Sequence, residues 1–151
     1  MIGLDVGDVR IGIAAADGLG LTAQGLPTMR RRKLKEDLDQ IIGIIEERRA
    51  GELVVGLPKN MDGSLGPQGE KVRAFVDALI TRMEESGQTA PVVTFWDERL
   101  TTVSANRTLL EADLSRKKRK EAVDKVAAVL ILQGYLDYIY NKKNQIKDVT
   151  P

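Results

Sequence analysis

The chain opens with a short apolar run that contains an acid and ends at a glycine turn. Residues 2–6 read Ile-Gly-Leu-Asp-Val, and Gly7 and Asp8 follow them. Such a run predicts a buried β-strand, where a carboxylate is costly unless a hydrogen bond, a cation or a metal offsets the cost. Asp5 therefore constrains both the fold, which must bury this strand, and the chemistry available at its end.

The composition limits what chemistry such a site can support. The chain has 151 residues, a net charge of +1, and neither histidine nor cysteine. Disulfides and thiolate catalysis are excluded, and so are most general bases. No apolar run approaches the roughly 20 residues of a membrane span, and Asp5 interrupts the stretch that a signal peptide would need. We expect one cytoplasmic domain with no membrane attachment, whose carboxylates carry any catalysis.

The hydrophobic pattern predicts three strands, followed by helices that alternate with strands. Strands are expected at residues 2–6, 10–16 and 21–28, because apolar residues there lie between tight turns. Later elements follow from changes of periodicity. They are a helix at 33–49, a strand at 52–57, a helix marked by residues 72–83, a strand at 91–96, a helix from 101 or 102 to 110, and a final helix that ends near Tyr140.

This order of elements predicts an α/β fold with a mixed sheet of five strands flanked by helices. The opening strands form hairpins, and the later ones pair in parallel through helical crossovers. Residues 1–140 are assigned to this domain and residues 141–151 to a polar, frayed tail. Ligands bind such sheets beyond the C-terminal ends of the parallel strands. Asp5, the 56–66 loop and the pair Asp97-Glu98 all fall at ends of this kind.

Three acids stand at positions that suggest a metal site. Asp5 ends the first strand, Glu98 follows the last strand beside Asp97, and Asp124 lies near the start of the final helix, on its apolar face. Oxygen ligands alone favour Mg²⁺ or Mn²⁺ over zinc or copper. Two such ions about 4 Å apart can activate water and stabilise the leaving oxygen in phosphodiester cleavage.

Each acid also has a structural interpretation. Asp5 could accept hydrogen bonds from turn amides around Gly7. Asp97 or Glu98 could pair with Arg99 or cap the next helix, and the helix dipole favours an acid at the position of Asp124. A structural role for all three is the less favoured alternative, because their positions converge on one end of the sheet.

Two basic runs could attract phosphate backbones. One comprises residues 30–33 with Lys35, and the other comprises residues 116–120. A solvated helix start or loop is the alternative for each run. Aromatic residues make up only 4% of the chain, which argues against a base-stacking platform.

Four segments resemble the sequence blocks of the YqgF (RuvX) family. They read DVGDVRIG at 5–12, GLPKNMDGS at 56–64, DERLTT at 97–102 and DKVAA at 124–128, and they span nearly the whole chain. Members of this bacterial family are described as pre-16S rRNA nucleases or as Holliday-junction-resolvase-like proteins. The resemblance implies a ribonuclease-H-like fold and a metal-dependent nuclease. It places the family's acidic positions at Asp5, Glu98 and Asp124, with Glu98 preferred over Asp97.

A nuclease of this kind needs cationic and polar contacts to its substrate. Arg10 and Arg99 could hold phosphate oxygens through paired hydrogen bonds. Lys59, Asn60 and Ser64 lie in a loop suited to a nucleic-acid backbone. A flexible arm over the substrate is expected from the run Arg116, Lys117, Lys118 and Arg119.

The chain departs from the family pattern just after Gly7. The family commonly has a small hydroxyl residue and then a basic residue there, whereas this chain has Asp8 and Val9. Asp8 adds negative charge near the expected metal site, and Val9 removes a phosphate contact. Substrate handling at this turn is therefore in question, while the three expected ligands are present.

The leading hypothesis is an Mg²⁺- or Mn²⁺-dependent nuclease that acts on structured RNA of the ribosomal small-subunit precursor, as a monomer or homodimer. The first alternative is a resolvase that cuts branched DNA, which would work as a symmetric dimer. An actin-like ATPase or sugar kinase shares the aspartate-x-glycine hairpin but needs a second domain. A non-catalytic RNA-binding module for ribosome assembly is the remaining alternative, and the intact set of acids argues against it.

Overall fold

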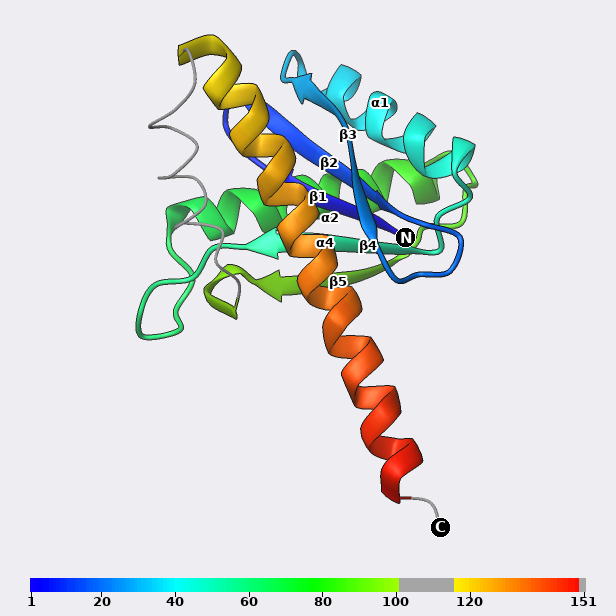
Figure 1. Ribbon diagram of the computed structural model, residues 1–151. Coiled ribbons are helices and arrows are strands. Elements are labelled where there is room, and N and C mark those ends of the chain that lie inside the picture. Colours follow the sequence, from blue (N-terminus) through cyan, green and yellow to red (C-terminus); the bar gives the residue numbers. More distant parts are fainter. Residues whose placement is uncertain (101–115, 150–151) are drawn as a thin grey trace.

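A five-stranded mixed sheet with the order β3-β2-β1-β4-β5 forms the centre of the molecule (Figure 1). The computed structural model describes residues 1–100 and 116–149, with side chains for residues 123–145 of the second segment. The strands are β1 (Ile2–Val6), β2 (Arg10–Ala16), β3 (Ala23–Arg30), β4 (Glu52–Leu57) and β5 (Val92–Asp97). The first three pair antiparallel, and β1, β4 and β5 pair in parallel, as the order of elements predicts.

Helices cover both faces of the sheet. Helices α1 (Leu34–Glu47) and α2 (Pro67–Glu85) pack on one face, and α4 (Arg116–Val149) crosses the other. The expected α/β fold with a mixed five-stranded sheet is thus confirmed. Within the described part of the chain, no helix is long and apolar enough to cross a membrane.

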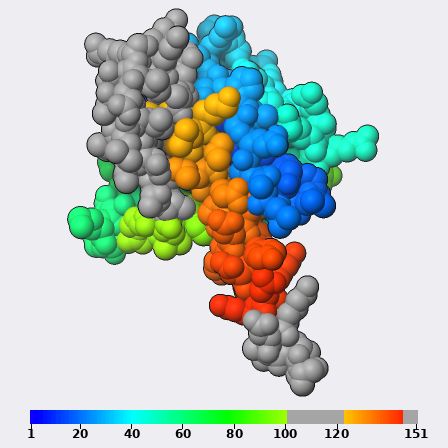
Figure 2. Space-filling view, viewed as in Figure 1, coloured from blue at the N-terminus to red at the C-terminus, as the bar shows by residue number. Residues whose placement is uncertain are grey.

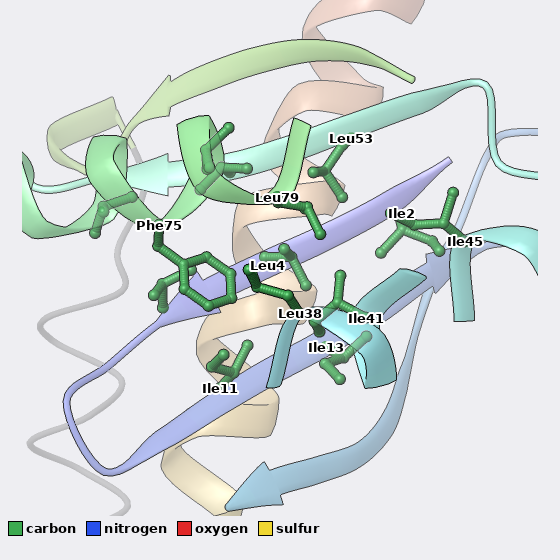
Figure 3. Close-up of a cluster of buried hydrophobic side chains, with 14 of the residues drawn as sticks. Ile2, Leu4, Ile11, Ile13, Leu38, Ile41, Ile45, Leu53, Phe75 and Leu79 are labelled. Atoms are coloured by element: carbon green, nitrogen blue, oxygen red, sulfur yellow. The ribbon is translucent and has the colours of Figure 1, made fainter. Parts of the chain in front are cut away.

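The two faces of the sheet have different side chains. The α1/α2 face carries large aliphatic residues, and Figure 3 shows Leu4, Leu38 and Leu79 meeting from β1, α1 and α2. The α4 face is built from small residues on the strands, such as Ala14, against Ile131 and Leu132 of the helix. Because side chains alternate along a strand, Ile2, Leu4 and Val6 face α1 and α2, and Gly3 and Asp5 face α4.

Glycines on the strands let α4 lie unusually close to the sheet. A Cβ atom at Gly3 would stand 2.8 Å from Cβ of Leu132, and one at Gly12 would collide with the carbonyl oxygen of Asp124. At Gly56 the obstacles would be Ile131 and the carboxylate of Glu98. The constraint is strictest at Gly12, where the obstacle is the backbone of α4, while at Gly56 it is the ends of two side chains.

Some element boundaries differ from those predicted. β3 runs two residues beyond the expected end, to Arg30, and α4 continues to Val149 instead of ending near Tyr140. No glycine or proline lies between Tyr135 and Val149 to stop the helix. Figure 1 shows these last turns projecting beyond the sheet, so the backbone of the polar tail is helical to Val149. The helix expected at 101–110 lies outside the described residues.

The first basic run is partly structural. The Arg31 guanidinium donates to the carbonyl of Gly7 at 3.1 Å and pairs with buried Asp37 at 3.3 Å. It also lies 5.1 Å from the ring centroid of Phe75 on α2. Arg31 therefore ties the turn after β1 to α1 and α2, a packed position that differs from the solvated one considered as the alternative for this run.

Replacing Gly12 with alanine should push α4 away from the sheet. We expect Gly12→Ala to lower the free energy of unfolding by about 1–3 kcal/mol, the usual cost of overpacking. Gly43→Ala is the matched control, because a Cβ at this exposed position in α1 meets nothing within 4 Å. It should stabilise the protein by about 0.5–1 kcal/mol. Urea unfolding of both variants tests this, and equal effects would show that the contact at Gly12 is unimportant.

Candidate active site

Asp5 lies near the end of the central strand, on the face covered by α4. It is buried, with 7% of its surface exposed, and its partner across the sheet is Gly12 of β2. On the other side lies β4, whose register with β1 pairs Leu4 with Val55. Asp5 and Gly56 each follow this last pair by one residue, so they lie side by side on β1 and β4. Asp5 thus has a glycine on each neighbouring strand.

Glu98 reaches the space over one of these glycines. It begins the 3₁₀ turn η1 (Glu98–Leu100), directly after β5. A Cβ atom at Gly56 would lie 2.8 Å from Oε1 of Glu98, so the carboxylate lies directly over this glycine. Trp96 pairs with Gly56 and packs against α4, which places this register position on the α4 face. The carboxylate of Glu98 is therefore directed to the same face as Asp5.

Asp124 lies over the other glycine. Its main-chain carbonyl occupies the space that a side chain at Gly12 would fill, so this turn of α4 sits beside Asp5. Its carboxylate Oδ2 accepts a hydrogen bond of 2.8 Å from Nε of Arg10. The two side chains are 20% (Arg10) and 22% (Asp124) exposed. This ion pair is thus mostly shielded from water and stronger than a surface pair.

The structure therefore brings Asp5, Glu98 and Asp124 from three distant segments to one end of the sheet. Among the described side chains, no group of three acids is close enough to enclose one metal ion. The donors are all carboxylate oxygens, which is the chemistry that Mg²⁺ and Mn²⁺ prefer. The glycines at 12 and 56 let the backbone of Asp124 and the carboxylate of Glu98 approach the sheet on the α4 face. The residues present fit a divalent cation of this type.

The neighbouring acid Asp97 has a different role. Its carboxylate binds Arg99, with Oδ2 accepting from a terminal guanidinium nitrogen at 2.6 Å and Oδ1 from Nε at 3.0 Å. Asp97 pairs with Leu57, which packs on the α1/α2 face. The hydrogen bonds from the Arg99 side chain are the main reason that the pKa of Asp97 is lowered. Pairing with Arg99 was the structural alternative for either Asp97 or Glu98, and the pair is found at Asp97.

Arg99 also holds the loop between β4 and α2. Its guanidinium donates to the carbonyls of Asn60 at 3.3 Å and Met61 at 3.4 Å. Arg99 was predicted to bind phosphate. In this structure its guanidinium N–H groups bind oxygen atoms of the protein instead. It connects the end of β5 to the loop that follows β4.

The loop is organised by its own polar side chains. Asp62 Oδ1 accepts from both the amide and the hydroxyl of Ser64, and these bonds lower the pKa of Asp62. Asn60 donates to the Ser64 hydroxyl at 3.0 Å. Asn60 and Ser64, expected to touch nucleic acid, therefore brace one another while remaining exposed. Lys59 is half-buried, and its charge also lowers the pKa of Asp97.

The turn that departs from the family pattern faces the other side of the sheet. Asp8 Oδ1 lies 3.4 Å from the Nζ of Lys71 on α2, and both side chains are exposed. Val9 is exposed as well. The added charge of Asp8 thus lies on the α2 side of the sheet, and Asp124 lies on the opposite side, which α4 covers.

Gly12 and Gly56 lie at the site but were not among the residues predicted for it. Glycine inside a strand is a signal of close backbone approach, and both glycines lie inside predicted strands. The backbone of Arg116–Arg119 forms the first turn of α4, which corrects the expected flexible arm. This stretch contains no glycine or proline to interrupt the helix. The side chains of this run lie outside the described residues.

The sequence is similar to a known family over most of its length. The model of the RuvX family, described as Holliday junction resolvase, matches residues 1–138. A Clostridium tetani protein named "Putative pre-16S rRNA nuclease" is 53% identical over 142 residues, covering 94% of this chain and 99% of that protein. A Thermoanaerobacter pseudethanolicus protein of the same name is 54% identical, with the same coverage.

A solved structure shares the fold at low sequence identity. RuvC of T. thermophilus in complex with a Holliday junction substrate aligns with a TM-score of 0.54 and 14% identity. The alignment covers 91% of this chain and 96% of RuvC. The sheet and helices described above therefore form a ribonuclease-H-like fold of the RuvC type.

The ion pair of Asp97 and Arg99 should be visible in a pH titration. Because Arg99 lowers the pKa of Asp97, the pair stabilises the fold above the unfolded pKa of about 3.9. This contribution is lost as the pH falls through the lower folded pKa. In Arg99→Met, the pKa of Asp97 should rise toward its ordinary value. Carboxyl-carbon NMR measures both values.

Asp39 is the internal reference for this titration. Its pKa is lowered chiefly by Arg82, far from the loop, and should be the same in both proteins. If Asp97 titrates identically with and without Arg99, the ion pair does not contribute in solution.

Proposed function

The chain belongs to the RuvX family, and we propose that it is a nuclease that cleaves phosphodiester bonds in the precursor of 16S rRNA. One observation carries this proposal: the acid on the central strand is flanked by two glycines, with Glu98 over one and Asp124 over the other. Strand interiors rarely use glycine without a packing reason. Here Gly12 lets the backbone at Asp124 approach the strand, and Gly56 lies under the carboxylate of Glu98, both next to a third acid.

In this proposal Asp5, Glu98 and Asp124 hold Mg²⁺ or Mn²⁺. When bound, the metal would supply an activated water and stabilise the leaving oxygen. Asp5 provides a ligand on the rigid central strand, where burial fixes its side chain. Glu98 and Asp124 reach the site from η1 and α4.

The cationic and polar residues around this edge would bind the nucleic acid. Lys59, Asn60 and Ser64 lie in the braced loop beside Asp97, so a backbone could contact a preorganised surface there. The second basic run would lie at the start of α4, two turns before Asp124. Five consecutive cations at the positive end of a helix dipole repel one another and the dipole. Neighbouring phosphates would relieve that repulsion.

The relatives' names and the family description point to different substrates. The named relatives are pre-16S rRNA nucleases, and the family model is described as Holliday junction resolvase. We favour RNA because the relatives are similar over nearly their whole length. Maturation of ribosomal RNA would place the protein in the cytoplasm. Branched DNA is the second candidate, and it would call for a homodimer, because a junction presents two symmetric strands.

Asp5→Asn should abolish cleavage without unfolding the protein. The amide keeps the size of the side chain but removes the charge that a divalent cation needs. We expect the Mg²⁺-dependent rate on a precursor 16S rRNA transcript to fall by about 100-fold or more, with a melting temperature close to that of the wild type. Asp39→Asn, on the surface of α1, makes the same change far from the site and should cleave normally.

The same assay on a four-way DNA junction, together with the solution mass, separates the two substrates. Cleavage of RNA by a monomer supports the proposal, and exclusive cleavage of the junction by a dimer supports the resolvase. Unchanged cleavage by Asp5→Asn would exclude the assignment of the metal site.

Reversing the charges of residues 116–120 to glutamate should weaken RNA binding. The slope of log affinity against log salt should also become shallower, by about 0.7–0.9 for each phosphate that the variant no longer neutralises. Glutamates at Lys142 and Lys143, roughly 36 Å along the same helix, are the control and should change little. If the affinity and the salt slope of the 116–120 variant match the wild type, this run does not touch RNA.

A further inference from the structure

Arg10 is a predicted phosphate-binding residue that contacts a proposed metal ligand, Asp124. It begins β2 and lies two residues from Gly12, on the same face of the sheet. Its Nε donates to Asp124 Oδ2 at 2.8 Å. Gly7 and Arg10 are joined by a main-chain hydrogen bond of 3.0 Å. Arg10 therefore stands just beyond the end of β1, farther out than Asp5.

The position of this ion pair explains the arrangement of the acids. The main chain of Asp124 lies over Gly12, beside Asp5, while its carboxylate is directed to Arg10. Three carboxylates at one end of a sheet repel one another unless a cation is present. The Arg10 guanidinium supplies that positive charge. It also draws the carboxylate of Asp124 away from a shared position, in agreement with the absence of a three-acid cluster among the described side chains.

We propose that Arg10 is a placeholder counter-ion: it neutralises Asp124 until a divalent cation binds, and is then released to hold a substrate phosphate. This inference rests on the proposed function, because it assumes that Asp124 is a metal ligand. A guanidinium suits both partners, since its fork of N–H donors matches carboxylate and phosphate alike. Arg10 is thus a positioning residue for Asp124 first and a substrate contact second.

This role predicts opposite effects on metal and RNA. In Arg10→Met the carboxylate of Asp124 has no competing partner, so Mn²⁺ should bind about tenfold tighter without RNA. Paramagnetic resonance titration of the free metal measures this affinity. In cleavage assays, the Mg²⁺ concentration for half-maximal rate should fall, while the KM for RNA should rise. A merely structural role for Arg10 would not tighten metal binding.

Two controls separate pairing from simple loss of positive charge. Lys59→Met removes a nearby cation whose charge lowers the pKa of Asp97, a residue outside the proposed ligand set. Arg82→Met breaks the Arg82–Asp39 pair, which is remote from the site. Both variants should bind Mn²⁺ within about twofold of the wild type.

The wild-type protein gives a test that needs no mutation. The Nε–H of Arg10 should be protected from exchange without metal and should lose that protection as Mg²⁺ is added. The Nε–H of Arg82, bonded to Asp39 at 2.6 Å, is the internal reference and should not change. This NMR titration decides the question even if Arg10→Met fails to fold.

The outcomes distinguish this inference from the function on which it rests. If the wild type binds Mn²⁺ and Asp5→Asn does not, the metal site stands. An unchanged Arg10 signal, or equal or weaker Mn²⁺ binding by Arg10→Met, then overturns the placeholder role alone. If the wild type binds no divalent cation even with RNA present, the proposed function and this inference both fail.

Discussion

The rest of the structure depends on the close approach of α4 to the sheet. Strands rarely allow a helix backbone to touch them, because side chains on the sheet hold the layers apart. Here glycines at 3, 12 and 56 remove those side chains, so that α4 settles directly on β1, β2 and β4. In Figure 2 the helix lies against the strands β2 and β3, and its C-terminal turns stand clear of them. This contact positions Asp124 next to Asp5 and gives the α4 face a different character from the aliphatic face opposite. The same glycines that weaken the strands thus make a site possible.

The electrostatics of the site follow from this packing. Burying an acid on the central strand is costly, and placing two more beside it raises the cost unless cations balance them. In the described structure Arg10 binds one of these acids, Asp124. Arg99 binds Asp97, the neighbour of Glu98 in the chain. Adjacent acids thereby acquire different roles. Asp97 faces the α1/α2 side and anchors the loop through Arg99, whereas Glu98 is directed over Gly56. The register of β5 puts Asp97 beside Leu57, and Glu98 turns to the other face because it begins η1, just beyond the strand.

Much of the fold follows from local sequence signals. The strands at 2–6, 10–16 and 52–57 have the predicted bounds, because apolar runs between glycine and aspartate turns are local features. The order of elements was enough to predict mixed pairing and acids at the strand ends. The long-range contacts were not predictable: Arg10 and Asp124 are 114 residues apart in the chain. The end of α4 was predicted too early, because polarity alone does not stop a helix. The ligand set and the RNA contacts stay predictions.

The turn after β1 shows how a departure from a family pattern can be judged physically. Asp8 looks unfavourable in the sequence, because it adds an acid three residues from Asp5. In the fold its carboxylate lies toward Lys71 on α2, and the Gly7 carbonyl is held by Arg31 on the same side of the sheet. The charge is exposed to water, which weakens its effect on groups beyond the sheet. A substitution at Asp8 therefore changes the charge of the surface next to α2. The surroundings of the carboxylates on the α4 face stay the same. The placement of a residue on one face of the sheet, more than its distance along the chain, decides which chemistry it can influence.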